Sequence, residues 1–318
     1  MEISKVPSAL LEGAASVIKG KEEFLEYLIT VLLAGGHVLL EDLPGLGKTT
    51  VAKTLSHLIA DNEGRPLAFK RIQFTPDLLP YDITGVDVFD PDLRNFRFVP
   101  GPIFANLILA DEINRTTPKV QSALLEVMAE QQVTIGSETR PVPSPFMVIA
   151  TQNPVESEGT FPLPAAQLDR FMMRLSLGYP HKEAELDILN FDPSEKILAG
   201  LTPVVTAADL SEAKAAVEQV YCHPELKEAI VDLARASRNH PDIRLGASPR
   251  SSLHLLKAVR SYAFINGRDY VVDEDIIALG PLVLSHRLKF ADPRTDGAPL
   301  VRRLAIEICQ KHKLSLDR

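Results

Sequence analysis

Residues 41–50 have the sequence EDLPGLGKTT, and this stretch decides the fold. It follows the apolar run 37–40 (HVLL) and precedes 51–55 (VAKTL), which has the composition of a helix. A buried strand, a turn rich in glycine and proline, and a helix that opens on Lys-Thr-Thr form the context of a phosphate-binding loop. Backbone N–H groups of such a turn face phosphate oxygens, and the helix N-terminus adds partial positive charge. In this interpretation Lys48 reaches the β- and γ-phosphates of a nucleotide, and the Thr49 hydroxyl holds Mg²⁺.

One position departs from the phosphate-loop pattern GxxxxGK[ST]. Asp42 occupies the place of the first glycine. The stretch alone therefore leaves two interpretations open, a nucleotide site and an ordinary strand-to-helix turn that contains Gly47-Lys48-Thr49. Residues further along the chain have to decide between them.

Composition and charge restrict the class of protein. The chain has 318 residues, of which 45% are hydrophobic and 24% charged, and a net charge of −8. These values are typical of a soluble globular protein, and the acidic balance argues against an extended nucleic-acid-binding surface while leaving room for a local basic patch. Cys222 and Cys309 lack metal-ligand spacing, so we expect thiols in a reducing compartment. No signal-peptide pattern is present and the apolar run 27–40 is too short to cross a bilayer, which predicts a cytoplasmic protein without a membrane span.

Strand and helix patterns alternate up to Pro180, which predicts an α/β fold with a parallel sheet flanked by helices. Strands are predicted over 37–41, 69–74, 107–110, 146–150 and 173–177, and helices over 8–17, 22–34, the stretch from the loop to about Ala60, and 118–131. A hairpin is predicted over 133–140 with its turn at Gly136-Ser137. The region 75–102, rich in proline and aspartate, carries a turn signal at 90–92.

Beyond Pro180 the pattern predicts helices and no strand. They cover 182–191, 209–220, 224–237, 249–265, 273–288 and 298–312. Ser248 before Pro249 and Asp273 before Glu274 are candidate caps. We therefore expect a nucleotide-binding core over 1–200, with a linker over 181–207, and a smaller all-helical lid domain over 201–318.

Polar side chains follow two of the buried strands. Asp111 and Glu112 end the run 107–110, where two adjacent carboxylates are costly unless a cation or hydrogen bonds compensate them. In an ATPase the first would hold Mg²⁺ through its water shell and the second would polarise the attacking water; the alternative is a helix N-terminus that favours acidic residues. Asn153 follows the run 146–150 and could hydrogen-bond the γ-phosphate and the water, or simply occupy a turn before proline.

Two arginines are candidates for contact with the transferred phosphate. Arg170 precedes the last predicted strand of the sheet, and Arg250 opens a helix of the second domain. A guanidinium offered to the γ-phosphate contributes roughly 10³–10⁵ in rate. A lone arginine is more often a surface residue or a salt-bridge partner.

Taken together, these segments resemble the MoxR family of AAA+ ATPases over nearly the whole chain. The segments that carry the resemblance are LLEDLPGLGKTT, RIQFTPDLLPYDITG, FVPGPIFANLILADEINRTTPKVQSALLEVMAEQQVTIG, VIATQNPVESEGTFPLPAAQLDRF and GASPRSSLHLL. The resemblance implies a P-loop AAA+ core followed by a helical lid. It also implies that Asp42 is tolerated, and that ATP is bound by the Walker A residues Pro44, Gly45, Leu46, Gly47, Lys48, Thr49 and Thr50.

The resemblance assigns roles to the remaining candidates. Asp111 and Glu112 correspond to the Walker B pair, with Asp111 and Thr49 holding Mg²⁺, and Asn153 corresponds to sensor 1. Arg170 corresponds to the arginine finger that reaches the nucleotide of the neighbouring subunit, and Arg250 to sensor 2 of the lid.

Further residues have weaker assignments, each with an alternative. Val17 and Ile18 would line the adenine pocket or belong to the core. Gln73 would couple Glu112 to remote contacts or be a surface amide, and Arg115 would contact the inter-subunit site or form a local salt bridge.

Two segments of this family project toward the central pore of a ring. They correspond to 85–104 and 132–142, where Phe96, Phe98 and Phe104 are candidate apolar contacts, with burial as the alternative.

The function that the resemblance implies is a Mg²⁺-dependent ATP hydrolase. It would act as a homo-oligomeric ring, expected to be a hexamer, and as a chaperone-like remodeler of a protein client, often one with a von Willebrand factor A domain. A metal-chelatase-type motor subunit and a nucleic-acid-associated AAA+ motor are the alternatives, and the acidic balance and the lack of an appended DNA-binding module count against the second. A non-catalytic scaffold is disfavoured because Glu112, Asn153 and Arg170 are all present.

Overall fold

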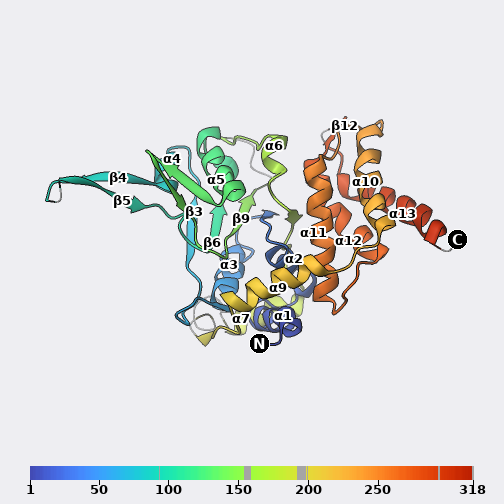
Figure 1. The fold of residues 1–318 in the computed structure, drawn as a ribbon, viewed down its shortest axis with the longest axis horizontal. Coiled ribbons are helices and arrows are strands. Elements are labelled where there is room, and N and C mark those ends of the chain that lie inside the picture. The colour runs from blue at the N-terminus through green and yellow to red at the C-terminus, as the bar shows by residue number, and fades with distance from the viewer. Residues whose placement is uncertain (93, 154–158, 192–197, 199, 293, 317–318) are drawn as a thin grey trace.

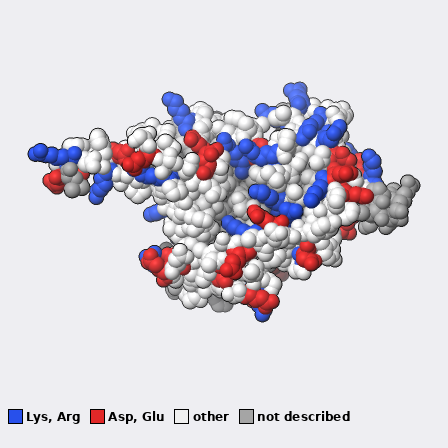
Figure 2. Space-filling view, in the orientation of Figure 1, with Lys and Arg blue, Asp and Glu red and all other residues white. Residues whose placement is uncertain are grey.

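The computed structural model contains an α/β part and a helical part packed together, with a long hairpin extending from the α/β part (Figure 1). It describes residues 1–92, 94–153, 159–191, 198, 200–292 and 294–316. Within these ranges, every helix is too short or too polar to cross a membrane. On the face drawn in Figure 2, Lys and Arg side chains gather over the helical part and its junction with the α/β part.

A parallel sheet of five strands forms the centre of the α/β part, as predicted. The strands are β1 (Val38–Glu41), β3 (Phe69–Gln73), β6 (Leu107–Asp111), β9 (Met147–Gln152) and β10 (Met173–Leu175). Their order is β10-β1-β9-β6-β3, and every neighbouring pair is parallel. The carboxyl ends of all five therefore meet at one edge, where ligand sites of open α/β sheets lie.

The three central strands, β1, β6 and β9, are buried on both faces, which is why their sequences are mostly apolar runs, whereas the edge strand β3 exposes Lys70 and Arg71. Along β6, Leu107 and Leu109 enter one core cluster, while Ile108 and Ala110 enter the other. The first cluster is covered by α1 (Val6–Val17), α2 (Glu22–Leu33) and α3 (Lys48–His57), and the second by α4 (Pro80–Thr84) and α5 (Pro118–Glu130). A short 3₁₀ turn, η1 (Ile3–Lys5), precedes α1.

Two short strands correct the prediction that the helix after the loop continues to Ala60. Helix α3 ends at His57, and β2 (Ile59–Ala60) pairs in parallel with β11 (Val205–Thr206). The competing structure is a backbone ladder with a segment almost 150 positions away, which no local pattern could reveal. This pairing attaches the end of the predicted linker to the α/β part.

Two antiparallel hairpins leave the sheet. β7 (Gln132–Ile135) and β8 (Glu138–Pro141) form the predicted one. β4 (Gly85–Asp90) and β5 (Asn95–Pro100) form the second, within the region for which the sequence indicated only a turn. The Arg140 guanidinium lies 4.2 Å from the centre of the Phe98 ring, so a cation–π contact joins the two hairpins.

The three phenylalanines of this region differ in exposure. Phe96 is 66% exposed and packs edge-on against Phe89 near the end of the β4–β5 hairpin. Phe98 and Phe104 are half-buried and pack on each other. The sequence left burial open as the alternative for all three phenylalanines, and Phe98 and Phe104 are indeed partly buried.

The helical part contains α9 (Ala207–Gln219), α10 (Pro224–Asn239), α11 (Pro249–Ile265), α12 (Asp273–Leu284), the 3₁₀ turn η3 (Ser285–Arg287) and α13 (Gly297–Leu316), preceded in the chain by α7 (Lys182–Phe191). The prediction of no strand here is wrong, because β12 (Ile243–Leu245) pairs antiparallel with β13 (Lys289–Phe290). Ser248 caps α11 as predicted, whereas Val272 and not Asp273 is the N-cap residue of α12. Residues 192–197 and 199 of the predicted linker lie outside the described residues.

The two parts share one apolar core. Helix α11 packs on α2, and the buried Ser261 hydroxyl donates a hydrogen bond to the Thr30 carbonyl at 2.8 Å. A continuous cluster of buried side chains runs from the sheet through α2 into α11 and α12.

His37 sits at the start of β1 in the buried interior and provides a pH-dependent element of stability. Nδ1 accepts a hydrogen bond from the Val148 N–H at 3.0 Å, and Nε2 contacts the Met128 carbonyl at 3.1 Å. Burial lowers the pKa of His37 from its usual 6.5 to about 4. The unfolded chain therefore takes up a proton near pH 6.5 that the folded protein resists until about pH 4.

We predict that acidification from pH 7 to pH 5 lowers the free energy of unfolding by about 2 kcal/mol through His37. Urea denaturation of the wild type and of His37→Gln, which does not titrate, measures this at both pH values. The variant should show a smaller loss on acidification than the wild type. Equal losses would contradict the assignment, since His254 and His286 contribute alike to both proteins.

Candidate active site

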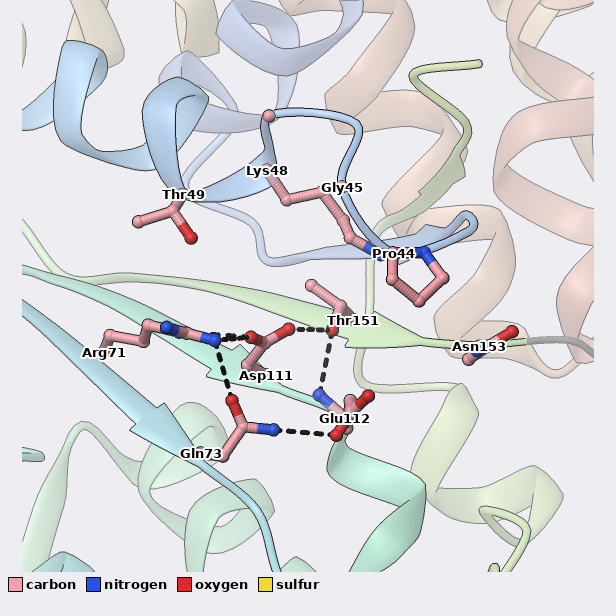
Figure 3. A pocket seen from close by; sticks show the side chains of 11 residues that line it. Pro44, Gly45, Lys48, Thr49, Arg71, Gln73, Asp111, Glu112, Thr151 and Asn153 are labelled. Atoms are coloured by element: carbon pink, nitrogen blue, oxygen red, sulfur yellow. Dashed lines mark hydrogen bonds and ion pairs between the residues drawn. The ribbon is translucent and has the colours of Figure 1, made fainter. Parts of the chain in front are cut away.

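The loop between β1 and α3 has the backbone of a phosphate-binding turn. Gly45 has φ +83° and Gly47, the N-cap residue of α3, has φ +87°, a region that favours glycine. The Lys48 side chain folds back over the loop, where its Nζ donates to the Asp42 carbonyl at 2.9 Å. Figure 3 shows Lys48 and Thr49 on the loop side of a space that faces the ends of the strands.

Asp42 has a structural role that explains its place in the loop. Its carboxylate is buried and accepts hydrogen bonds from Ser176 Oγ at 2.7 Å, Leu177 N at 2.7 Å and Gly178 N at 3.1 Å. A glycine there would leave two buried or half-buried N–H groups and a hydroxyl without this partner. The aspartate thus fastens the segment after β10 to the loop.

A cavity of about 250 Å³ lies between the loop and the carboxyl ends of the strands. It brings together most of the predicted phosphate and catalytic residues, from the loop and from the ends of β3, β6 and β9. Its lining consists of Pro44, Gly45, Gly47, Lys48, Thr49, Arg71, Gln73, Asp111, Glu112, Thr151 and Asn153.

Asp111 is held by partners on both neighbouring strands. Its Oδ1 accepts a hydrogen bond from Thr151 Oγ1 at 2.7 Å, and its Oδ2 accepts from Arg71 Nη2 at 2.6 Å and Nε at 3.1 Å. The carboxylate, half-buried at the end of an apolar strand, is thereby compensated.

Glu112 has the unusual backbone φ +57° and ψ +50° of the left-handed region. Strain of this kind persists where the surroundings fix the residue. Its N–H donates to Thr151 Oγ1 at 2.9 Å, and its Oε2 accepts from Gln73 Nε2 at 2.7 Å and lies 3.4 Å from Arg115 Nη1. Figure 3 shows the second carboxylate oxygen directed away from Gln73.

These contacts bear on two of the weaker assignments. Gln73 donates to Glu112 and also accepts from Arg71 Nη2 at 2.8 Å, while its coupling to remote contacts stays a prediction. Arg115 forms the local ion pair that was one of its two alternatives.

Sequence reasoning missed Arg71 and Thr151. Arg71 stands two positions before Gln73 on β3, so both side chains emerge from the same face of the strand. Thr151 is the first polar residue of β9 after four buried ones. The side-chain alternation along a strand, counted back from Gln73, could have indicated Arg71, and the position two residues before Asn153 could have indicated Thr151.

A second cavity, of about 480 Å³, lies on the other side of the loop. Val17 and Ile18 line it together with Leu46, Gly47 and Thr50, opposite the segment 177–180. Val17 is also 4% exposed and packs in the core, so its core role is confirmed and its contact with adenine stays a prediction. The loop thus separates a polar cavity from a mostly apolar one, which suits a triphosphate and a planar base.

Two predicted residues lie outside both cavities of their own protomer. Arg170 is half-buried and its Nη1 donates to the Leu125 carbonyl of α5 at 2.6 Å. Arg250 is exposed in the first turn of α11. Their predicted contacts with nucleotide stay predictions.

The oxygen donors of the first cavity fit Mg²⁺. Asp111 and the Thr49 hydroxyl face the same space, and hard cations of this kind are held by one or two carboxylates together with substrate phosphates. Within the described ranges, no group of three His, Cys, Asp or Glu side chains could hold a metal by itself.

These features define an AAA-type ATPase: a five-stranded parallel sheet that carries a phosphate loop, a pair of carboxylates and a polar residue at the end of a further strand, and a helical lid that follows the sheet in the chain. The chain matches the family described as ATPase family associated with various cellular activities (AAA) over residues 37–173 and the AAA lid domain over 235–305.

Similar proteins specify the branch of this class. The chain is 47% identical to YeaC of Bacillus subtilis over 87% of this chain and 85% of that protein, and 40% identical to Chaperone MoxR1 of Mycobacterium tuberculosis over 90% and 76%. A crystal structure described as that of a candidate ATPase from Cytophaga hutchinsonii has a TM-score of 0.85 and 37% identity, covering 97% of this chain and 94% of that one. The protein belongs to the MoxR family of AAA+ ATPases.

A more distant relative is the magnesium-chelatase 38 kDa subunit of Acidiphilium rubrum. It is 28% identical over 70% of this chain and 63% of its own length.

The hydroxyl of Thr151 carries the Asp111 and Glu112 contacts, so we predict that Thr151→Val lowers ATP turnover about 10- to 100-fold. Affinity for a fluorescent ATP analogue should stay within about threefold, because the phosphate loop is untouched. Steady-state hydrolysis and equilibrium binding measure the two effects.

Thr54→Val is the matched control for this change. Thr54 is 1% exposed and its hydroxyl has no hydrogen-bond partner among the described residues, so the same substitution there should leave turnover unchanged. Equal effects of the two variants would show that Thr151 acts through packing alone.

Proposed function

We propose that the protein hydrolyses ATP in the cavity between the phosphate loop and the ends of the strands. The observation that carries the proposal is the single cavity lined by Lys48, Thr49, Asp111, Glu112 and Asn153. Each type of group that phosphoryl transfer needs, a cation, a metal ligand, a carboxylate and an amide, is present there.

The chain's own groups divide the work as follows. Loop N–H groups and Lys48 bind the phosphates, and Thr49 and Asp111 would hold Mg²⁺, which when bound neutralises charge on the β- and γ-phosphates. Thr151 and Arg71 keep the Asp111 carboxylate oriented for that ion. The ATP base enters the second cavity, beside Val17 and Ile18.

Glu112 polarises the attacking water. Gln73 and Arg115 engage its Oε2, and the tie between its N–H and Thr151 fixes the backbone, so the second oxygen has a defined direction. Asn153 supplies a neutral amide that can hydrogen-bond the γ-phosphate and the water without competing for the proton.

The site is completed by a second copy of the chain. Arg170 lies outside the cavity of its own protomer and would serve the neighbour, as the family resemblance implies. Contacts that repeat from head to tail generate a ring when the rotation closes, and we expect a hexamer. Arg250 would report the nucleotide to the lid, and hydrolysis would change the angle between lid and core.

The biological role that we propose is chaperone-like remodeling of a protein client. Support comes from the relative named Chaperone MoxR1 and from the projecting β4–β5 hairpin, with its exposed Phe89 and Phe96. A client with a von Willebrand factor A domain and a cytoplasmic location are predictions from the resemblance.

The magnesium-chelatase subunit among the relatives keeps the metal-chelatase-type motor as the second candidate function. Co-purification with a tetrapyrrole or metalloenzyme partner would favour it. Lys and Arg side chains gather on part of the face drawn in Figure 2, and DNA-stimulated hydrolysis would favour a nucleic-acid motor.

The shared site predicts complementation between two inactive variants. Lys48→Ala should lose nucleotide binding, and Arg170→Ala should bind ATP but lose about 10³-fold in turnover. An equal mixture should regain about one quarter of wild-type turnover, because half of the subunits keep the loop and half of their neighbours keep the arginine.

The mixture has to be assembled together, with co-assembly verified by capture of a tag on one variant. No recovery in co-assembled material would refute a site completed by the neighbour. Retained tight ATP binding by Lys48→Ala would refute the assignment of the loop.

A further inference from the structure

A polar cluster joins the segment after α6 (Ala165–Leu168) to the lid, where α6 packs against η3. The Asp169 carboxylate accepts hydrogen bonds from Ser248 Oγ at 2.9 Å and Ser251 Oγ at 3.1 Å. Arg287 Nε of η3 lies 3.4 Å from the same carboxylate. One carboxylate of the α/β part thus binds two elements of the lid.

The cluster is built around a buried charge. The Arg287 side chain is 2% exposed, donates to the Phe171 carbonyl and contacts His254 Nδ1. Burial lowers the pKa of Arg287 to about 10, and burial together with Arg287 lowers the pKa of His254 to about 3. An apolar contact would hold the two parts together without the cost of burying ions. The buried polar cluster therefore has the additional effect of fixing the relative geometry of the two parts.

Its members are adjacent in sequence to both predicted phosphate-sensing arginines. Asp169 immediately precedes Arg170, and Ser248 and Ser251 flank Arg250. The two serines form the capping box of α11, with each hydroxyl 3.1 Å from the backbone nitrogen of the other residue. A shift of the first turn of α11 therefore acts directly on the carboxylate next to Arg170.

We propose that Asp169 is a positioning residue that makes Arg170 follow the lid of its own protomer. The inference rests on the proposed function, in which hydrolysis changes the angle between lid and core and Arg170 serves the nucleotide of the next protomer. Nucleotide in one site then changes the placement of the arginine offered to the neighbouring site. The hydrogen bonds of Asp169 are the route of this coupling.

A second attachment makes the coupling two-sided. Arg170 Nη1 is bound to the Leu125 carbonyl of α5, so the arginine is held by the α/β part while its neighbour Asp169 is held by the lid. In this proposal the arginine releases the Leu125 carbonyl when it reaches a neighbouring nucleotide. The position of the lid, acting through Asp169, biases that release.

The test measures the effect of Asp169 in a neighbouring site. Wild-type protein is assembled with an equal amount of a dopant that cannot bind nucleotide, either Lys48→Ala alone or Lys48→Ala combined with Asp169→Asn, Ser251→Ala, Arg170→Ala or Ser261→Ala. ATP turnover per wild-type subunit is measured, and capture of a tag on the dopant verifies co-assembly. Because the dopant has no nucleotide of its own, a loss cannot come from damage to its own loop.

Ser261→Ala is the matched control. It removes a buried hydrogen bond between α11 and the α/β part, the one to Thr30, without touching Asp169. Ser251→Ala removes one bond to Asp169 while the Ser248 cap remains, so it tests the proposal if Asp169→Asn folds poorly.

We expect the Asp169→Asn dopant to lower turnover per wild-type subunit by about half relative to Lys48→Ala alone, close to the Arg170→Ala dopant, since half of the wild-type sites face a dopant. Ser251→Ala should lower it in the same direction, and Ser261→Ala should have no effect. A loss with Arg170→Ala but none with Asp169→Asn or Ser251→Ala would overturn the inference alone. No loss with Arg170→Ala would overturn the shared site and the inference with it.

Discussion

Two adjacent carboxylates at the end of a buried strand have to be compensated, and the structure around the cavity depends on how this is done. Asp111 and Glu112 leave β6 side by side, where low dielectric makes unpaired charge costly. A single hydroxyl, that of Thr151, donates to one carboxylate and accepts from the N–H of the other residue. Arg71 and Gln73 complete the network from β3.

The sheet makes this network possible. Parallel pairing of β6 with β3 on one side and β9 on the other brings the polar ends of three strands to the same edge. The loop closes over that edge from β1, and Asp42 locks it to the segment after β10. Because the residues of the cavity come from strand ends or the loop, the packing of the sheet sets the geometry of the cavity. The lid is joined to the sheet through α2 and the Asp169 cluster.

Much of this was predictable because it is local or periodic. Apolar runs predicted the central strands of the sheet, and glycine spacing with Lys48 predicted the loop. Asp42 looked like a defect of the loop, because its partners are some 135 positions away. Arg71 and Thr151 were missed because their contacts with Asp111 depend on the pairing of β6 with β3 and with β9. The β2–β11 and β12–β13 pairings involve two or three residues each, too few for a pattern.

The most direct measurement compares binding and hydrolysis of ATP by Glu112→Gln. Glutamine keeps the size of the side chain and can still pair with Gln73, but it cannot act on water as a carboxylate does. If Glu112 polarises the attacking water, the variant should retain ATP while its turnover falls about 10²- to 10⁴-fold. Undiminished turnover with intact binding would contradict that role and move the chemistry away from the end of β6.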